Sequence, residues 1–98
     1  MGHGRSELSP SFRSRIETLR REVVGNVYEG TVDRQSGKKG DPVVRGVGSY
    51  QTLCVIIEYY REKPLAEERV RFRIDEINPS TTPDGKANVV AFGSLVYQ

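Results

Sequence analysis

The chain has 98 residues, 36% of them hydrophobic and none of them tryptophan, which suits one small domain with a compact core and excludes two. No apolar run reaches the roughly 18–20 residues that span a bilayer, and the N-terminal residues lack the apolar segment of a secretory signal, so we expect no membrane contact. The formal net charge is only +2, so an affinity for polyanions requires that charges be segregated in space.

An amphipathic helix is predicted over residues 9–24, after a disordered stretch at residues 1–8. Ser9 fits the N-cap, Pro10 fits the first helical position, and Gly25 supplies a stop. Apolar side chains recur at spacings of four, three and four and form one stripe: Phe12, Ile16, Leu19 and Val23. We expect this stripe to dock on the rest of the domain.

After Gly25 the hydrophobic pattern changes from helical to alternating, which indicates strands. Five strands are predicted, separated by turns rich in glycine and proline: residues 26–34, 42–49, 50–60, 69–77 and 87–97. Such a run of short strands favours a closed barrel over an open sheet. Residues 25–98 are therefore predicted to form a five-stranded OB-like β-barrel, in a mainly β protein with an N-terminal amphipathic α-helix. The third strand is the most apolar, and we expect it to be the most central.

Three residues in apolar runs are assigned to core packing. Phe72 and Phe92 fall in phase with the expected core positions, and Cys54 lies in the apolar run of the third strand, where a thiol behaves as a small hydrophobe. A single cysteine excludes an intramolecular disulfide and indicates a reducing, cytoplasmic location.

The fourth strand, "RVRFRIDEI", alternates cationic and apolar side chains. Strand geometry places Arg69, Arg71 and Arg73 on one face. Guanidinium groups in a row repel one another, so this face needs counter-charges, for which Glu58 and Asp75 are candidates, or an anionic ligand. These arginines have two interpretations. They form a solvated face that only aids solubility, or they contact the phosphate groups of a ligand.

The turn "GKKGD" is the second cationic candidate. Its glycines let the backbone approach a ligand closely, Lys38 and Lys39 add charge, and Arg45 extends the same patch. It is not the phosphate-binding loop of nucleotide-binding enzymes, because the Gly-x-x-x-x-Gly-Lys-Ser/Thr spacing is missing. An ordinary hairpin turn with solvated lysines is the alternative.

Tyrosines provide flat side chains on which bases can stack. Tyr59 and Tyr60 are adjacent, so on a strand they face opposite sides. We expect Tyr50 and Tyr60 to be the exposed stacking residues.

The order of the segments "VYEGTVDRQSGKKGDPVVRG", "LAEERVRFRIDEI" and "GKANVVAFG" resembles the TRAM domain, over roughly residues 24–93. Pro42 stands where that family usually has a second glycine. The resemblance implies a small OB-type barrel that binds RNA, and a chain of this length resembles the free-standing members of the family, which look like RNA chaperones.

The sequence therefore predicts low-specificity RNA binding through arginine and lysine contacts to phosphate, with tyrosine stacking and no cofactor. DNA binding is left open. One alternative is a protein-interaction adaptor that docks through an exposed stripe on the N-terminal helix, and a homodimer through that helix is also left open. No catalysis is expected, because the single histidine, His3, cannot build a triad or a histidine metal site.

Overall fold

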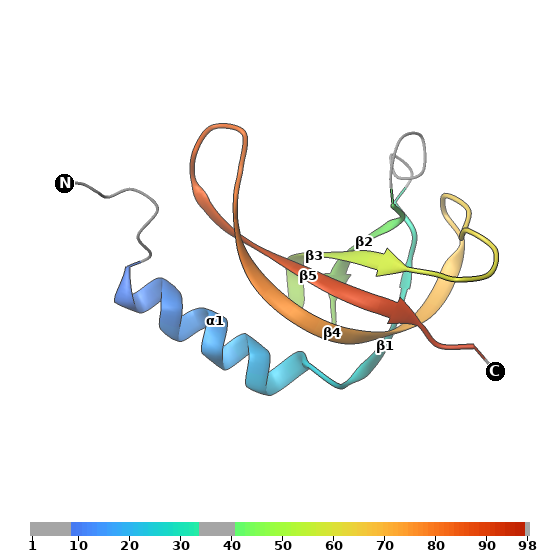
Figure 1. Ribbon diagram of the computed structural model, residues 1–98, viewed down its shortest axis with the longest axis horizontal. Helices are drawn as coiled ribbons and strands as arrows, with labels where there is room; N and C mark the ends of the chain where they lie inside the picture. The colour runs from blue at the N-terminus through green and yellow to red at the C-terminus, as the bar shows by residue number, and fades with distance from the viewer. Residues whose placement is uncertain (1–8, 34–40, 98) are drawn as a thin grey trace.

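The computed structural model describes residues 9–33 and 41–97. It contains one helix and five strands in chain order (Figure 1): α1 (Pro10–Val23), β1 (Val27–Thr31), β2 (Val43–Val47), β3 (Tyr50–Glu58), β4 (Arg69–Thr81) and β5 (Ala87–Leu95). The predicted mainly β, barrel-like fold with an N-terminal helix is confirmed. The stretch 1–8, and with it its expected disorder, lies outside the described residues.

The five strands form one sheet in the order β1-β4-β5-β3-β2. Neighbouring strands are antiparallel except β3 and β5, which are parallel. An isolated bridge between Val32 and Val44 brings the two outer strands together, and the Asp33 amide donates to the Val43 carbonyl at 2.7 Å. The sheet is therefore curled into a nearly closed barrel. Its middle strand is β5, so the prediction that the third strand is the most central is wrong.

The core fills the inside of this curled sheet. Alternation along β4 buries Phe72 and Ile74 completely, and β3 contributes Val55 and Ile57, which are equally inaccessible. Branched and aromatic side chains from facing strands thus meet in one cluster. Burial of these side chains is the main force that holds the barrel together.

Two glycines mark where the chain passes closest to its neighbours. A β-carbon on Gly93 of β5 would lie 2.7 Å from the Arg73 carbonyl oxygen and 3.2 Å from Val55 Cγ1. A β-carbon on Gly30 of β1 would lie 2.6 Å from Val44 Cγ1. Both strands therefore need glycine at these positions for the barrel to close as tightly as it does.

The close packing of β5 decides which of its faces points inward. Ala91 and Gly93 face the core, and the larger Phe92 is turned outward and is 37% exposed. The opposing strand has a register irregularity between Ile74 and Glu76, at the level of Gly93. The prediction that Phe92 packs in the core is therefore wrong, because the phase of β5 turns Ala91 and Gly93 inward, where the neighbouring strands come closest.

Cys54 also lies on the outer side of the sheet. It is half-buried on β3, opposite Arg45 of β2, whose Nη1 donates to the cysteine Sγ at 3.2 Å. The expected core position is therefore wrong for this residue. β3 carries apolar side chains on both faces, so its pattern did not indicate which face is inside.

The helix α1 packs alongside β4 (Figure 1). Ser9 Oγ accepts from the Phe12 amide at 3.1 Å, as expected for an N-cap. Ile16 and Val23 of the apolar stripe are buried, and Arg20 Nε donates to the Ile77 carbonyl at 3.1 Å. The Gly25 amide then donates to the Ile74 carbonyl at 2.7 Å, which fixes the end of the helix to the barrel.

We predict that Gly93→Ala destabilises the protein by about 1–3 kcal/mol, because the new methyl group overlaps the Arg73 carbonyl oxygen and must push β4 and β5 apart. Urea denaturation followed by circular dichroism measures the change. Asn88→Ala, at an exposed position of the same strand, is the control and should leave the midpoint nearly unchanged. A Gly93→Ala midpoint equal to that of the control would contradict the close approach.

Candidate nucleic-acid interface

The predicted cationic face of β4 is present in the structure. Arg69, Arg71 and Arg73 are exposed, whereas the residues that alternate with them, Val70 and Phe72, are buried. The strict change between charged and apolar side chains fixes which face points outward, because a shift by one residue would bury all three arginines. The three guanidinium groups therefore share one outer surface of the barrel.

Closure of the barrel brings a fourth arginine to the same surface. Thr31 of β1 lies opposite Arg69 in the register with β4. On the opposite edge of β1, the antiparallel bridge between Val32 and Val44 places Thr31, the residue before Val32, beside Arg45 of β2. We call the outer surface formed by Arg45, Arg69, Arg71 and Arg73 the arginine wall.

Carboxylates are interspersed along the arginine wall. Arg45 Nε lies 2.7 Å from Asp33 Oδ2, and this hydrogen bond is the largest cause of a raised pKa of Arg45. Arg69 Nη2 lies 3.5 Å from Glu29 Oε1, and Arg73 Nε lies 2.9 Å from Asp75 Oδ1. The surface is therefore a mixed one in which arginines outnumber carboxylates by one.

Of the two carboxylates expected from the sequence to balance the β4 arginines, Asp75 forms an ion pair with one of them, Arg73. Glu58 has no ion pair with any residue that the structure describes, and Glu29, which the sequence did not suggest, occupies the second place. Glu29 reaches Arg69 from the neighbouring strand β1. The pairing depends on the strand register and could not be derived from local spacing.

These ion pairs are weak because water surrounds them. The side chains of Arg45, Arg69 and Arg73 are 63%, 66% and 54% exposed, and exposed pairs contribute about 0–1 kcal/mol each. Arg71 makes no ion pair with any described residue. The wall thus holds one unpaired guanidinium and three whose carboxylate contacts an anionic ligand can replace.

Tyr60 forms an aromatic pair that the sequence did not reveal. Its ring centroid lies 4.7 Å from that of Tyr97 in an edge arrangement, and Arg61 Cζ lies 5.7 Å and 5.0 Å from the two centroids. Tyr60 is 74% exposed, as predicted for a stacking residue. We call Tyr60, Arg61 and Tyr97 the tyrosine platform.

The backbone connects the tyrosine platform to the arginine wall. The Val96 amide donates to the Arg71 carbonyl at 2.9 Å, so Tyr97 follows directly on the residue that pairs with Arg71. Because β3 and β5 are parallel, their C-terminal ends lie at the same end of the barrel and bring Tyr60 to Tyr97. The exposed Tyr60 ring and the half-buried Tyr97 ring thus lie at the end of β5 that runs beside Arg71.

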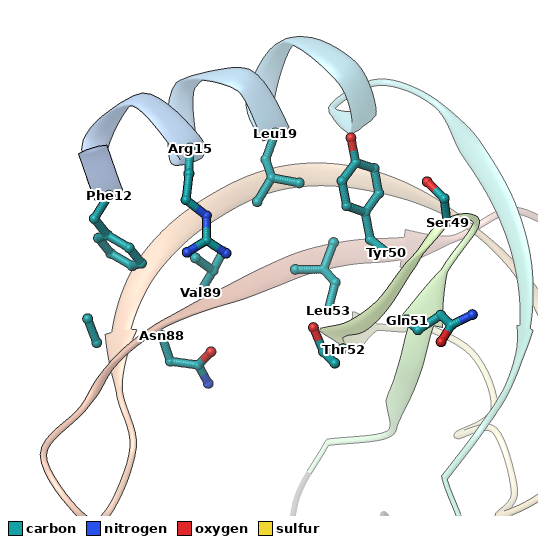
Figure 2. A pocket seen from close by; sticks show the side chains of 11 residues that line it. Phe12, Arg15, Leu19, Ser49, Tyr50, Gln51, Thr52, Leu53, Asn88 and Val89 are labelled. Carbon is teal, nitrogen blue, oxygen red and sulfur yellow. The ribbon is translucent and has the colours of Figure 1, made fainter. Parts of the chain in front are cut away.

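Tyr50 lies elsewhere, in a groove beneath the helix (Figure 2). This groove, which we call the helix groove, has a volume of about 320 Å³ and is lined by Phe12, Arg15 and Leu19 of α1, residues 49–53 and residues 87–89. The β3 strand starts at Tyr50 and ends at Glu58, shortly before Tyr60. The two predicted stacking tyrosines are therefore at opposite ends of one strand and do not form a single surface.

The remaining predicted site residues, Lys38 and Lys39, lie outside the described residues. In the part of the chain that is described, no group of three or more histidine, cysteine or acidic side chains is placed to hold a metal ion. No helix among the same residues has the length and apolarity needed to cross a membrane.

Comparisons with known proteins give no relatives. No family model matches the chain, and no curated protein or solved structure matches it either. The resemblance to the TRAM domain therefore rests on the sequence motifs alone.

We predict that Glu29→Gln changes the free energy of unfolding by less than about 1 kcal/mol, because its pair with Arg69 is exposed and long. Asp75→Ala should cost more, about 1–2 kcal/mol, because the Asp75 carboxylate accepts from both Arg73 and the Ser94 hydroxyl in a partly buried position. Urea denaturation measures both. Equal losses, or a larger loss for Glu29→Gln, would contradict this ranking.

Proposed function

We propose that the protein binds single-stranded RNA with low sequence specificity. Phosphate groups lie along the arginine wall and bases stack on the tyrosine platform. The observation that carries this proposal is the position of the exposed Tyr60 ring, which packs on Tyr97 just beyond the Val96 amide that donates to the Arg71 carbonyl. The Arg71 guanidinium has no ion pair with a described residue. Binding of single strands needs these two features together.

The electrostatics of the wall support binding that is reversible and moderate in strength. Phosphate can accept two parallel hydrogen bonds from one guanidinium group, which a single exposed carboxylate contact at 3.5 Å does not provide. The ligand therefore replaces weak internal pairs with stronger external ones. The carboxylates that remain keep the net attraction small.

The tyrosine platform supports a preference for unpaired bases. In a double-stranded RNA the bases are stacked on one another, whereas single strands expose their faces to aromatic side chains. Stacking on a tyrosine tolerates every base, because each has a π-face. Binding without sequence preference is what an RNA chaperone requires. Single-stranded DNA offers the same phosphates and comparable π-faces.

The alternative of a protein adaptor depended on an exposed apolar stripe on α1. Ile16 and Val23 are instead buried, and Phe12 and Leu19 are half-buried against the core cluster. The helix thus stabilises the barrel and offers a partner little free apolar surface. For this reason we favour RNA binding.

We predict that binding to a fluorescein-labelled uridine decamer weakens as salt rises, with a slope of log K against log salt of about −2 to −3, as for three or four phosphate contacts on a single strand. Arg71→Gln should make the slope less steep by about 0.7 and weaken binding. Arg21→Gln, an exposed arginine on α1, is the matched control and should change neither. Fluorescence anisotropy at several salt concentrations measures these values, and a slope near zero would reject phosphate contact.

We also predict that Tyr60→Ala weakens RNA binding by about 1–3 kcal/mol, the usual contribution of one stacked base. Tyr60→Phe should retain most of the affinity, because the ring and not the hydroxyl makes the stack. The same anisotropy titration distinguishes them at constant salt. Wild-type affinity in Tyr60→Ala would show that the tyrosine platform takes no part.

A further inference from the structure

The helix groove is a concave surface, separate from the arginine wall. Figure 2 shows Phe12, Arg15 and Leu19 reaching from α1 toward the sheet, while Tyr50 and Leu53 rise from β3 to meet them. The start of β5 closes the remaining side. The groove exists because the buried Ile16 and Val23 hold the helix against the barrel and leave its N-terminal turns beside the first residues of β3.

The interior of the groove fits a flat, apolar body. Leu53 and Val89 form an apolar floor on the sheet, Leu19 faces them from the helix, and the rings of Phe12 and Tyr50 stand toward the two ends of the groove (Figure 2). Aromatic rings favour flat π-systems packed face to face with an offset, or edge to face. A volume of about 320 Å³ is at the small end of the range for ligand pockets. One ring system with a small substituent therefore suits it better than an extended chain.

The polar groups at the rim add a charge preference. Arg15 is the one charged side chain among the described residues that line the groove, and it makes no ion pair with any of the residues described. Thr52 and Asn88 add a hydroxyl and an amide, which can donate to and accept from the edge of a base. The lining therefore complements a ligand with a flat body, a polar edge and a negative group.

We propose that the helix groove binds one nucleotide, with its base against Tyr50 and the apolar floor and its phosphate on Arg15. The nucleotide is either a free mononucleotide or an unstacked residue of an RNA strand, because both present the same base and phosphate. The site does not depend on RNA binding at the arginine wall, since the groove and the tyrosine platform are at opposite ends of β3.

The test is an NMR titration of the ¹⁵N-labelled full chain with each of the four nucleoside 5′-monophosphates. We expect amide shifts at Tyr50, Leu53 and Asn88. Arg15→Gln should weaken binding about tenfold to a hundredfold, as for a lost charge-assisted hydrogen bond. The matched control Arg21→Gln removes the same charge from the same helix outside the groove and should bind like the wild type. Arg15 is exposed, so its variant should fold normally.

Two further ligands separate the contributions of base and phosphate. Uridine should bind the same residues as uridine monophosphate, but with lower affinity. Its loss of affinity should equal the loss that Arg15→Gln causes for the monophosphate. Inorganic phosphate alone should not shift Leu53 on the groove floor. Equal shifts from phosphate alone, equal losses in Arg15→Gln and Arg21→Gln, or shifts confined to other surfaces would overturn the proposal.

A uridine decamer identifies the source of the nucleotide. Shifts in the groove with the decamer, lost in Arg15→Gln, support an unstacked RNA residue as the occupant, whereas groove shifts with monophosphates alone support a free nucleotide. Decamer shifts at Tyr60 and Arg71 with a groove that responds to neither ligand would reject this site and leave RNA binding at the wall intact. Groove binding with no response at Tyr60 or Arg71 would support the groove site and reject RNA binding at the wall.

Discussion

The close approach of β5 to its neighbours is the constraint on which the rest of the structure depends. Gly93 lies so near the Arg73 carbonyl and Val55 that no side chain fits between them. This contact fixes the inner face of β5, which pairs with β4, the strand that carries Arg73 and Arg71 on its outer face. At the other seam, Gly30 lets β1 approach Val44 and brings Arg45 beside the β4 arginines. Alternation along β4 thus supplies three arginines of the wall, and closure of the barrel adds the fourth.

The sequence predicted the orientation of those elements in which polar residues occupy one face and apolar residues the other. In "RVRFRI" every second residue is charged, so only one orientation avoids burying arginine, and the faces of β4 were predicted correctly. The helix was equally clear, because its cap and its apolar stripe agree. β3 and β5 are apolar on both faces, so Cys54 and Phe92 were placed on the wrong side. Only the packing around Gly93 decides their orientation, and packing is not visible in a local pattern.

The candidate site was predicted in its residue types more than in its arrangement. Asp75 is two residues from Arg73 on one strand, so their pairing was within reach of the sequence. Glu29 meets Arg69 across a register that joins residues 40 positions apart, and Tyr97 meets Tyr60 only because β3 and β5 are parallel. Tyr50 is separated from Tyr60 because the two residues lie at opposite ends of β3, and the end with Tyr50 faces α1.

The distance between the two proposed sites shapes how one strand of RNA can use them. The nine residues of β3 span about 30 Å between the helix groove and the region of the tyrosine platform. A single nucleotide can occupy only one of the sites, whereas a longer strand can reach both and gains from the high effective concentration of its second end. Each contact can then be weak, as the exposed ion pairs of the wall require, while the whole strand is still retained. Rapid exchange at each site with retention of the longer strand is the behaviour that the proposed low-specificity RNA binding requires.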